Sequence, residues 1–286
     1  MTSETSCRLC SSGDTELRIR LEGYAVHRCN ACGAVFSDLT AQRAAHLYDA
    51  EYFTEEFGPY FSALFGDADD TPLREHFTGY LDALERVVPA GRVLDVGCAA
   101  GLFLDVARGR GWQIQGVEIS EHAAAVARER RGIDVIVGDV MDVSLPAGHF
   151  DAVTMLDVLE HIIDPGRLLD RARTLVRPRG ALMLVLPNDR NLTRMAAMTA
   201  YRLSLGAWSY PASRVHQIYH VTYFTPATIT RLLKSPGFEI IGITPDETVR
   251  GLINESALMK AGVGTLFAVS RLLGLQNKMV VLAKPA

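Results

Sequence analysis

The sequence lacks the surplus of positive charge that a nucleic-acid-binding surface needs. Its 286 residues include 29 basic and 33 acidic side chains, for a net charge of −4 at pH 7. Neutralising many phosphates takes a face rich in lysine and arginine. The balance therefore argues against nucleic acid as a partner and leaves room only for a local basic patch.

Long apolar runs are absent as well. The longest nearly apolar stretch, residues 261–270, lies between Lys260 and Arg271 and is too short to cross a bilayer. The first residues, Met-Thr-Ser-Glu, lack the basic and apolar regions of a secretory signal. With 48% hydrophobic residues, the chain has enough apolar side chains for a full core and a small second module. We expect a cytoplasmic globular protein with no membrane span.

Cysteine is scarce, but four of the five cysteines follow a regular spacing. Cys7 and Cys10 form one C-x-x-C pair, Cys29 and Cys32 form another, and eighteen residues separate the pairs. This is the spacing of a four-thiolate zinc site. The alternative, two disulfides or unrelated buried thiols, is disfavoured in a reducing cytoplasm. We predict a zinc ribbon over residues 1–40 whose Zn²⁺ is structural, because the protein supplies all four ligands.

The role of the predicted ribbon has two interpretations, because similar ribbons also bind nucleic acids or proteins. It carries four arginines against five acidic residues, a balance that does not form a phosphate-binding face. We therefore expect it to cover the substrate site or to provide a contact in a homodimer.

The rest of the chain is organised around residues 93–101, where an apolar strand runs into a turn of small residues and then a helix. Gly97 and Gly101 flank the turn, so a ligand can approach the backbone and the amides of the helix N-terminus. The dinucleotide fingerprint G-x-G-x-x-G is missing. Glu118 ends the next strand, where a carboxylate can bind both hydroxyls of a ribose. Asp95 would repel a pyrophosphate but suits an amino acid group beside a sulfonium cation.

Strands and helices alternate through the remaining sequence. This alternation predicts an α/β fold with a doubly wound, mainly parallel sheet that binds ligands at the carboxyl ends of its strands. The first expected helix follows the turn and ends at residue 110, and three more span 121–131, 165–176 and 225–237. The expected strands span 114–119, 135–137, 152–156, 182–186, 239–244 and 278–283.

Residues 93–101 resemble the first motif of the class I S-adenosylmethionine-dependent methyltransferases, V-L-D-x-G-x-x-x-G. The resemblance continues in the ribose-binding strand at 116–120, the adenine-binding turn at 137–140 and the fourth strand with its Leu-Glu-His continuation at 150–161. It implies a Rossmann-like seven-stranded sheet over residues 71–286, with the last strand antiparallel. It also implies that S-adenosylmethionine is bound by Asp95, Gly97, Cys98, Ala99, Gly101, Glu118, Ile119, Asp139, Val140, Leu156 and Asp157.

Residues 41–70 form a predicted linker or lid that is rich in aromatic side chains. The resemblance places the segment Tyr48 to Phe53 over the cofactor, where Tyr52 would meet the sulfonium with its ring face. The alternative is ordinary packing of these aromatics against the domain. A helix capped at Thr71 follows, with Leu73 and Phe77 on its buried face.

The acceptor is expected outside the ends of the fourth and fifth parallel strands. Residues 189–224 show no sheet pattern, and with residues 246–277 they are predicted to form the substrate pocket or its lid. A hydroxyl acceptor needs a general base, for which His216 and His220 are the first candidates, followed by His161 and Asp157. For His161, the alternative is a structural role in the loop after the fourth strand.

The predicted activity is methylation of a small-molecule acceptor, such as a sugar, a lipid or a secondary-metabolite intermediate. The sugar C-methyltransferases have a similar order of ribbon and domain but longer chains, so O- or N-methylation is favoured. One alternative is an RNA or protein methyltransferase that uses the ribbon for substrate recognition. Another is a non-catalytic scaffold, which the intact cofactor motifs disfavour.

Overall fold

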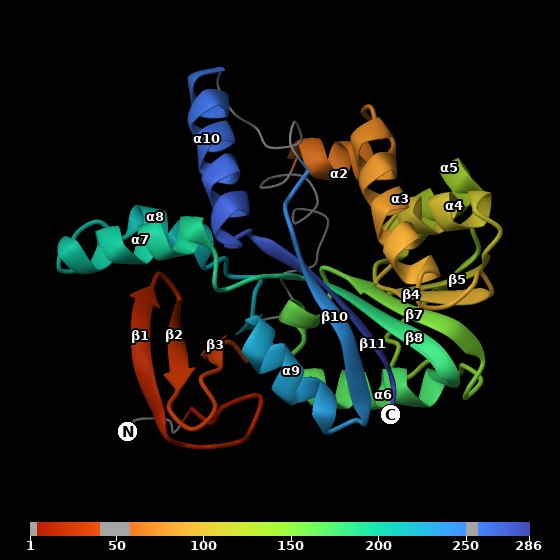
Figure 1. Cartoon of the computed structure of the whole chain (residues 1–286), viewed down its shortest axis with the longest axis horizontal. Coiled ribbons are helices and arrows are strands. Elements are labelled where there is room, and N and C mark those ends of the chain that lie inside the picture. Colours follow the sequence, from red (N-terminus) through yellow and green to blue (C-terminus); the bar gives the residue numbers. More distant parts are fainter. Residues whose placement is uncertain (1–4, 41–57, 250–256) are drawn as a thin grey trace.

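The computed structural model describes residues 5–40, 58–249 and 257–286. In this structure, a twisted sheet with helices on both faces makes up one half of the molecule, and a small second sheet lies at the other end (Figure 1). The predicted contacts of Tyr52 lie outside the described residues.

The large sheet has seven strands, as predicted. Their order is β10-β11-β8-β7-β4-β5-β6, and β11 alone runs antiparallel to its neighbours. The central parts of β8, β7 and β4 are mainly apolar and buried, so each contains a hydrophobic run in the sequence. The strands span Arg92–Val96 (β4), Gln113–Glu118 (β5), Val135–Val137 (β6), Phe150–Leu156 (β7), Val176–Pro187 (β8), Phe238–Asp246 (β10) and Lys278–Pro285 (β11).

Helices cover both faces of this sheet and bury two separate cores. One core lies under α3, α4 and α5, and the other lies under α6 and α9. Three of these helices begin at side-chain caps: Ser120, Asp164 and Thr225 each accept a hydrogen bond from a first-turn amide. The helices span Thr71–Glu85 (α3), Leu102–Gly109 (α4), Glu121–Arg131 (α5), Pro165–Leu175 (α6) and Pro226–Lys234 (α9).

The second half of the predicted linker is helical. Helix α2 (Gly58–Phe65) buries Ala63 and Leu64 in the core beside α3, and Phe65 stacks on His122 at 5.7 Å between ring centroids. Arg131 of α5 donates to the carbonyl of Leu64 at 2.9 Å. This part of the segment is therefore an integral layer of the sheet domain. Helix α3 begins at Thr71, as expected, but its N-cap is Asp70.

The ribbon sheet corrects one sequence expectation. Its strands β1 (Thr15–Leu21), β2 (Tyr24–Cys29) and β3 (Val35–Ser37) are joined by β9 (Thr222–Tyr223). Residues 189–224 are therefore not free of strand, since β9 pairs antiparallel with β3. A two-residue strand has too few positions to show alternation, and its pairing is set by a partner far away in the sequence.

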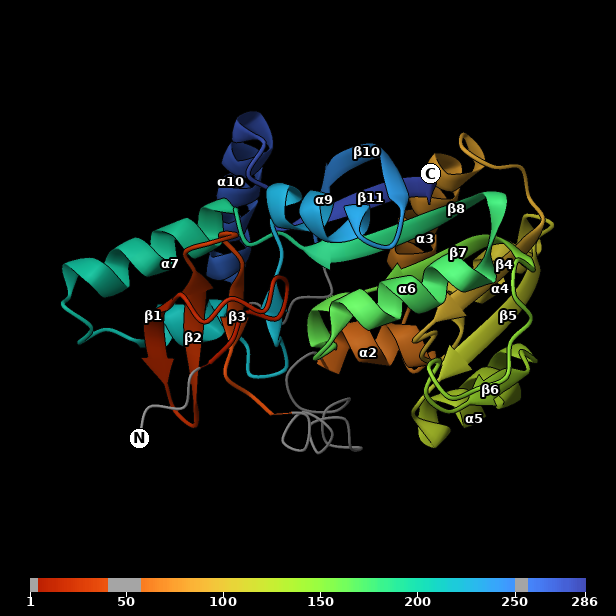
Figure 2. The same ribbon diagram turned by 90° about the horizontal axis from the view of Figure 1, so that it is seen from below.

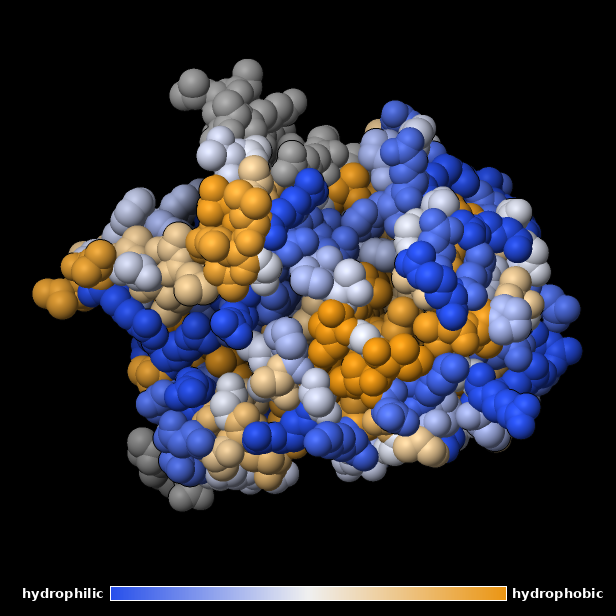
Figure 3. Space-filling view, in the orientation of Figure 1, coloured by the Kyte–Doolittle hydropathy of each residue, from blue (hydrophilic) through white to orange (hydrophobic). Residues whose placement is uncertain are grey.

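The remaining helices form an arm beside the ribbon. Helices α7 (Leu192–Leu203) and α8 (Tyr210–Val215) lie alongside β1 and β2, and Met198 and Ala212 pack with the ribbon in a third core (Figure 2). Hydrophobic side chains are exposed near the free end of α7 and on α10 (Ala257–Leu273) (Figure 3). Across the described ranges, no helix combines the length and apolar character that a membrane span requires.

Candidate active site

The turn after β4 has the backbone shape that its small residues predict. Gly97, Ala99 and Gly101 have φ values of 71°, 47° and 77°, all in the left-handed region. A Cβ on Gly97 would lie 2.7 Å from Cγ2 of Val158, so a side chain there has no space. The turn is therefore narrow, and it leads directly into the N-terminus of α4.

Glu118 lies at the end of β5, against this turn. Its carboxylate accepts hydrogen bonds from the amides of Ala99 at 2.8 Å and Ser120 at 2.9 Å. Burial raises the pKa of Glu118, although these amides oppose the effect. Each carboxylate oxygen retains a lone pair for a ligand hydroxyl. The neighbouring Ile119 side chain is 65% exposed and offers an apolar surface beside the carboxylate.

Asp95 and Cys98 face the interior rather than the open side of the turn. Asp95 is 2% exposed and accepts a hydrogen bond from the Thr154 hydroxyl at 2.6 Å. Burial raises the pKa of Asp95 to about 7. The Cys98 sulfur is buried against Gly116, where a Cβ would approach it to 2.6 Å. Asp95 therefore links β4 to β7, and Cys98 packs the turn against β5.

The predicted adenine-binding residues lie after β6. Asp139 is exposed and accepts a hydrogen bond from the Met141 amide at 2.9 Å, whereas Val140 is buried. Asp139 therefore presents a carboxylate to solvent on the same edge of the sheet as Glu118. This edge is where the parallel strands end.

Strand β7 ends at Leu156, and Asp157 follows with a left-handed φ of 54°. One Asp157 oxygen forms an ion pair with Lys278 at the start of β11. The other oxygen, Oδ1, is buried and has no hydrogen-bond partner among the described residues. Sequence reasoning missed Lys278, although a lone cation that opens an apolar strand was a usable signal.

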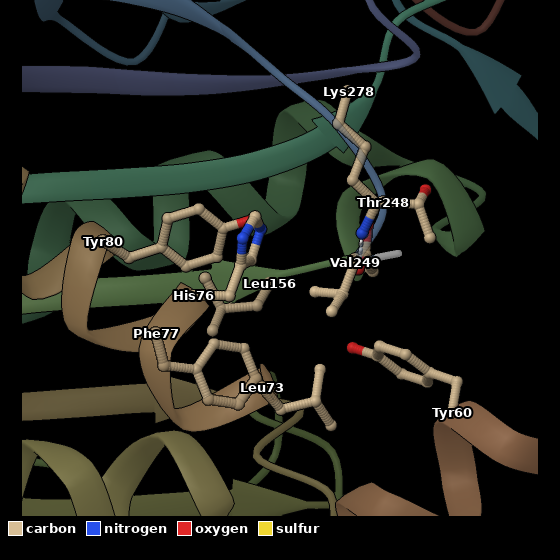
Figure 4. A pocket seen from close by; sticks show the side chains of 10 residues that line it. Tyr60, Leu73, His76, Phe77, Tyr80, Leu156, Thr248, Val249 and Lys278 are labelled. Atoms are coloured by element: carbon tan, nitrogen blue, oxygen red, sulfur yellow. Dashed lines mark hydrogen bonds and ion pairs between the residues drawn. The ribbon is translucent and has the colours of Figure 1, made fainter. Parts of the chain in front are cut away.

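Next to Asp157 lies a small cavity of about 20 Å³, roughly the volume of one water molecule (Figure 4). Apolar side chains from α3 line one wall, and the Tyr60 hydroxyl of α2 points into the space. Beside it, Asp246 accepts a hydrogen bond from Tyr80 at 2.6 Å and lies 3.2 Å from Nε2 of His76. These side chains were also missed, because they come from three distant segments of the sequence.

The structure brings His161 and His220 together. Their ring centroids are 4.9 Å apart, and His161 lies in the short helix η1 (Leu159–His161) that follows β7. Nδ1 of His161 is 2.9 Å from the carbonyl oxygen of Tyr219. Since a carbonyl only accepts, Nδ1 carries the proton and Nε2 has the lone pair. Burial lowers the pKa of both imidazoles, so both are neutral near pH 7.

His216 has a different environment. It is fully buried, and its Nδ1 is 3.0 Å from the carbonyl oxygen of Ala212. Its ring and that of His220 both contact the Tyr223 ring, at centroid distances of 5.2 and 6.2 Å. Burial, together with the charge of Arg194, lowers the pKa of His216 to about 3. The geometry therefore pairs His220 with His161 and places His216 in the core of the arm.

Within the described ranges, two groups of side chains bring three or more candidate metal donors together. The first is the predicted set of four cysteines, in which sulfur atoms are 3.5 Å apart for Cys7 and Cys32 and 3.6 Å apart for Cys10 and Cys29. The second is Glu160 with His161 and His220. Glu160 is 2% exposed, and burial raises its pKa well above the usual range.

The antiparallel seventh strand, the narrow turn and the acid at the end of β5 define the class I S-adenosylmethionine-dependent methyltransferase fold. The chain belongs to the methyltransferase-domain family, whose model matches residues 73–243. The protein is thus an S-adenosylmethionine-dependent methyltransferase.

Comparisons with individual proteins agree with this class. The chain is 31% identical over 179 residues to a ubiquinone biosynthesis O-methyltransferase of Xanthomonas axonopodis pv. citri, spanning 59% of this chain and 70% of the relative. It is 36% identical over 124 residues to the Pseudomonas aeruginosa (strain LESB58) protein of the same name, spanning 41% and 51%. The structure of a SAM-dependent methyltransferase from Archaeoglobus fulgidus shares the fold, with a TM-score of 0.52 and 21% identity over 74% of this chain and 92% of that chain.

Proposed function

We propose that the protein transfers a methyl group to an oxygen atom of a small-molecule acceptor. The observation that carries this proposal is the neutral His161 beside His220 at the carboxyl end of β7, because a hydroxyl must lose its proton as it is methylated. The two relatives reported above are named O-methyltransferases, which supports oxygen as the accepting atom.

The turn and its carboxylates fit S-adenosylmethionine. Val158 occupies the space where a Cβ on Gly97 would lie, and the left-handed backbone at Gly97, Ala99 and Gly101 forms a narrow turn of small residues beside which a ligand can bind. In our proposal, Glu118 binds the ribose hydroxyls, Ile119 contacts the adenine ring and Asp139 accepts from the adenine amine. Asp95 acts indirectly, because its buried carboxyl group accepts from Thr154 of β7 and so helps to hold β4, the strand that leads into the turn. Ala99, Gly101, Leu156 and Asp157 complete the lining that the sequence predicts.

When bound, S-adenosylmethionine supplies a methyl group on a positively charged sulfur, which is already activated toward an attacking oxygen. The residues of this chain then have two tasks, alignment and proton removal. Asp157, held by Lys278, marks the floor of the acceptor site with its unpartnered oxygen. Nε2 of His161 accepts the hydroxyl proton, and the Tyr219 carbonyl holds the ring in the tautomer that this requires.

The four cysteines are proposed to hold a structural Zn²⁺. Their sulfur atoms all lie within 4.8 Å of one another. Tetrahedral coordination at the usual Zn–S distance of about 2.3 Å places sulfur atoms about 3.8 Å apart, which is close to the observed separations. Cys7 and Cys29 are buried in a cluster too small to fold by apolar burial alone, so the metal would contribute folding energy.

The test is transfer of radiolabelled methyl from S-adenosylmethionine into a lysate that is then separated into small-molecule, RNA and protein fractions. We expect label in the small-molecule fraction, bound through an ether oxygen by mass spectrometry. Label that appears only in RNA or protein would overturn the proposal and assign substrate recognition to the ribbon. The location in the cytoplasm and the dimer contact stay predictions.

A further inference from the structure

The ribbon touches the acceptor side of the site through backbone hydrogen bonds. The Ser37 amide at the end of β3 donates to the carbonyl of Val221 at 3.0 Å, and the Val221 amide donates to the carbonyl of Glu160 at 2.8 Å. Val221 directly follows His220, and Glu160 directly precedes His161. A continuous ladder therefore runs from the ribbon to both histidines.

Arg8, in the first cysteine knuckle, adds side-chain hydrogen bonds to this chain of contacts. Its guanidinium donates to the carbonyls of Ser37, at 3.0 Å, and Leu39, and its Nη1 lies 3.5 Å from the carbonyl oxygen of Ile163. Ile163 follows η1, so one side chain joins the end of β3 to the segment that carries His161. The planar guanidinium suits this task, since its donors diverge in a fixed fork.

Two further contacts attach the ribbon to the sheet domain. Leu9 packs both against the cysteine cluster and against the core under α6. Arg18 of β1 forms an ion pair at 3.1 Å with Asp189, whose side chain is almost fully buried. Leu9 thus connects the first knuckle to the core under α6, and Arg18 connects β1 to the loop after β8.

We propose that Arg8 is a positioning residue for the methyl transfer. It couples the metal-bound knuckle to His161 and His220, so that the ribbon sets the geometry of the proton acceptor without touching either reactant. This inference rests on the role of His161 in the proposed function. It gives the ribbon a mechanical role in turnover, beyond covering the site.

The test compares Arg8→Lys with Arg28→Gln. Lysine keeps the charge and most of the aliphatic stem but cannot reach three carbonyls at once. Arg28 is the control, because it lies on β2 and its one ion pair among the described residues is with the exposed Glu16. The measurements are metal content, hydrogen exchange of residues 158–163 and 216–224, the dissociation constant of S-adenosylmethionine, and kcat with the acceptor identified above.

For Arg8→Lys we expect one bound metal and unchanged cofactor affinity. Amide exchange in both segments should rise at least tenfold, and kcat should fall at least tenfold. Arg28→Gln should match the wild type in all four measurements. Arg8→Lys with wild-type kcat, or with wild-type exchange at Val221, would overturn the proposal.

The outcomes also separate this proposal from the proposed function. If the wild type transfers no methyl group to small molecules, the proposed function fails, while the exchange measurement still decides whether Arg8 holds the two segments. If Arg8→Lys loses its metal, Arg8→Gln refolded with excess Zn²⁺ replaces it. Loss of metal in both variants would show that Arg8 supports the ribbon itself, and that result would also overturn the proposal.

Discussion

The carboxyl groups of Asp95, Glu118 and Glu160 are all withdrawn from solvent, at 2%, 7% and 2% exposure. Each accepts or lies near polar groups that only partly offset the cost of burial, so the pKa of each carboxyl group is raised. Their burial therefore carries a stability cost at the proposed cofactor and acceptor sites. This cost makes them accessible to measurements of stability against pH.

Asp95→Asn should flatten the pH dependence of stability in the ligand-free protein. The pKa of Asp95 rises from its ordinary 3.8 to about 7 on folding, so the native state retains a proton that the unfolded state has lost. The free energy of unfolding therefore decreases as pH rises from about 4 to about 7, by roughly 4 kcal/mol in total for this group. Urea unfolding at several pH values measures this slope. Asp134→Asn, at a fully exposed position, is the control and should keep the slope.

His161→Asn should separate the two nitrogens of the imidazole. The asparagine amide can still donate to the Tyr219 carbonyl from a position near that of Nδ1, but the lone pair of Nε2 is lost. We expect kcat to fall at least about 100-fold with the affinity for S-adenosylmethionine unchanged, as measured by steady-state kinetics and calorimetry. His149→Asn serves as the control. Wild-type turnover in His161→Asn would remove this residue as the base.

At the scale of elements, the conformation of the β4–α4 turn can be predicted from its small residues. Two of its three left-handed positions are glycine, and the third is Ala99. Ala99 is strained in this conformation by about 1 kcal/mol relative to glycine. At Gly97, Val158 leaves no space for a side chain. At Ala99, a glycine would relieve the backbone strain.

Gly97→Ala and Ala99→Gly should have opposite effects on this turn. A methyl group on Gly97 would collide with Val158 in a backbone conformation that alanine disfavours, so both stability and cofactor affinity should fall. Ala99→Gly should leave affinity intact and change the free energy of unfolding by at most about 1 kcal/mol toward greater stability. Thermal unfolding and calorimetric titration measure both effects. Equal cofactor binding by Gly97→Ala and wild type would contradict the assignment of the turn.

Sequence patterns identify the local features of this fold and miss the non-local ones. The run from Val93 to Gly101 and the alternation after it predict the sheet, because each strand and helix carries its own periodicity. Strand β9 leaves no such pattern, since its two residues gain their partner only through β3. Lys278 and Tyr60 were missed for the same reason: they meet Asp157 only after β11 and α2 have packed. His216 and His220 are four residues apart, which suggested that they act as a pair. In the structure, the ring of His220 instead contacts the ring of His161 from η1.

At the scale of the whole molecule, the ribbon and the sheet domain share an interface but have separate sources of stability. The ribbon has a small apolar cluster around its four cysteines and a third core shared with α7 and α8, whereas the sheet buries two large cores; we propose that a metal at the cysteines supplies the rest of the ribbon's stability. Loss of the metal should therefore affect one unit first.

Removing the metal with a strong chelator should unfold β1 to β3 and free β9, while the seven-stranded sheet persists. Hydrogen exchange should become fast over residues 5–40 and 216–224 and stay slow in β4, β7 and β8. Cofactor binding should survive, because no described ribbon residue lies at the turn after β4. Unchanged exchange over residues 5–40 in the metal-free protein would refute a folding role for the metal. Readdition of Zn²⁺ should restore protection.

The pairing of Phe36 with Thr222 has a consequence for synthesis of the chain. On the ribosome, the two cysteine knuckles emerge early and can capture metal, but β3 keeps an open edge until β9 has been translated. At about 5–20 residues per second, this delay is on the order of ten to forty seconds. During that interval the nascent ribbon presents an unpaired strand edge. Its last strand arrives only with the segment that contains His220, so the ribbon and the proposed acceptor site are completed in a single late step.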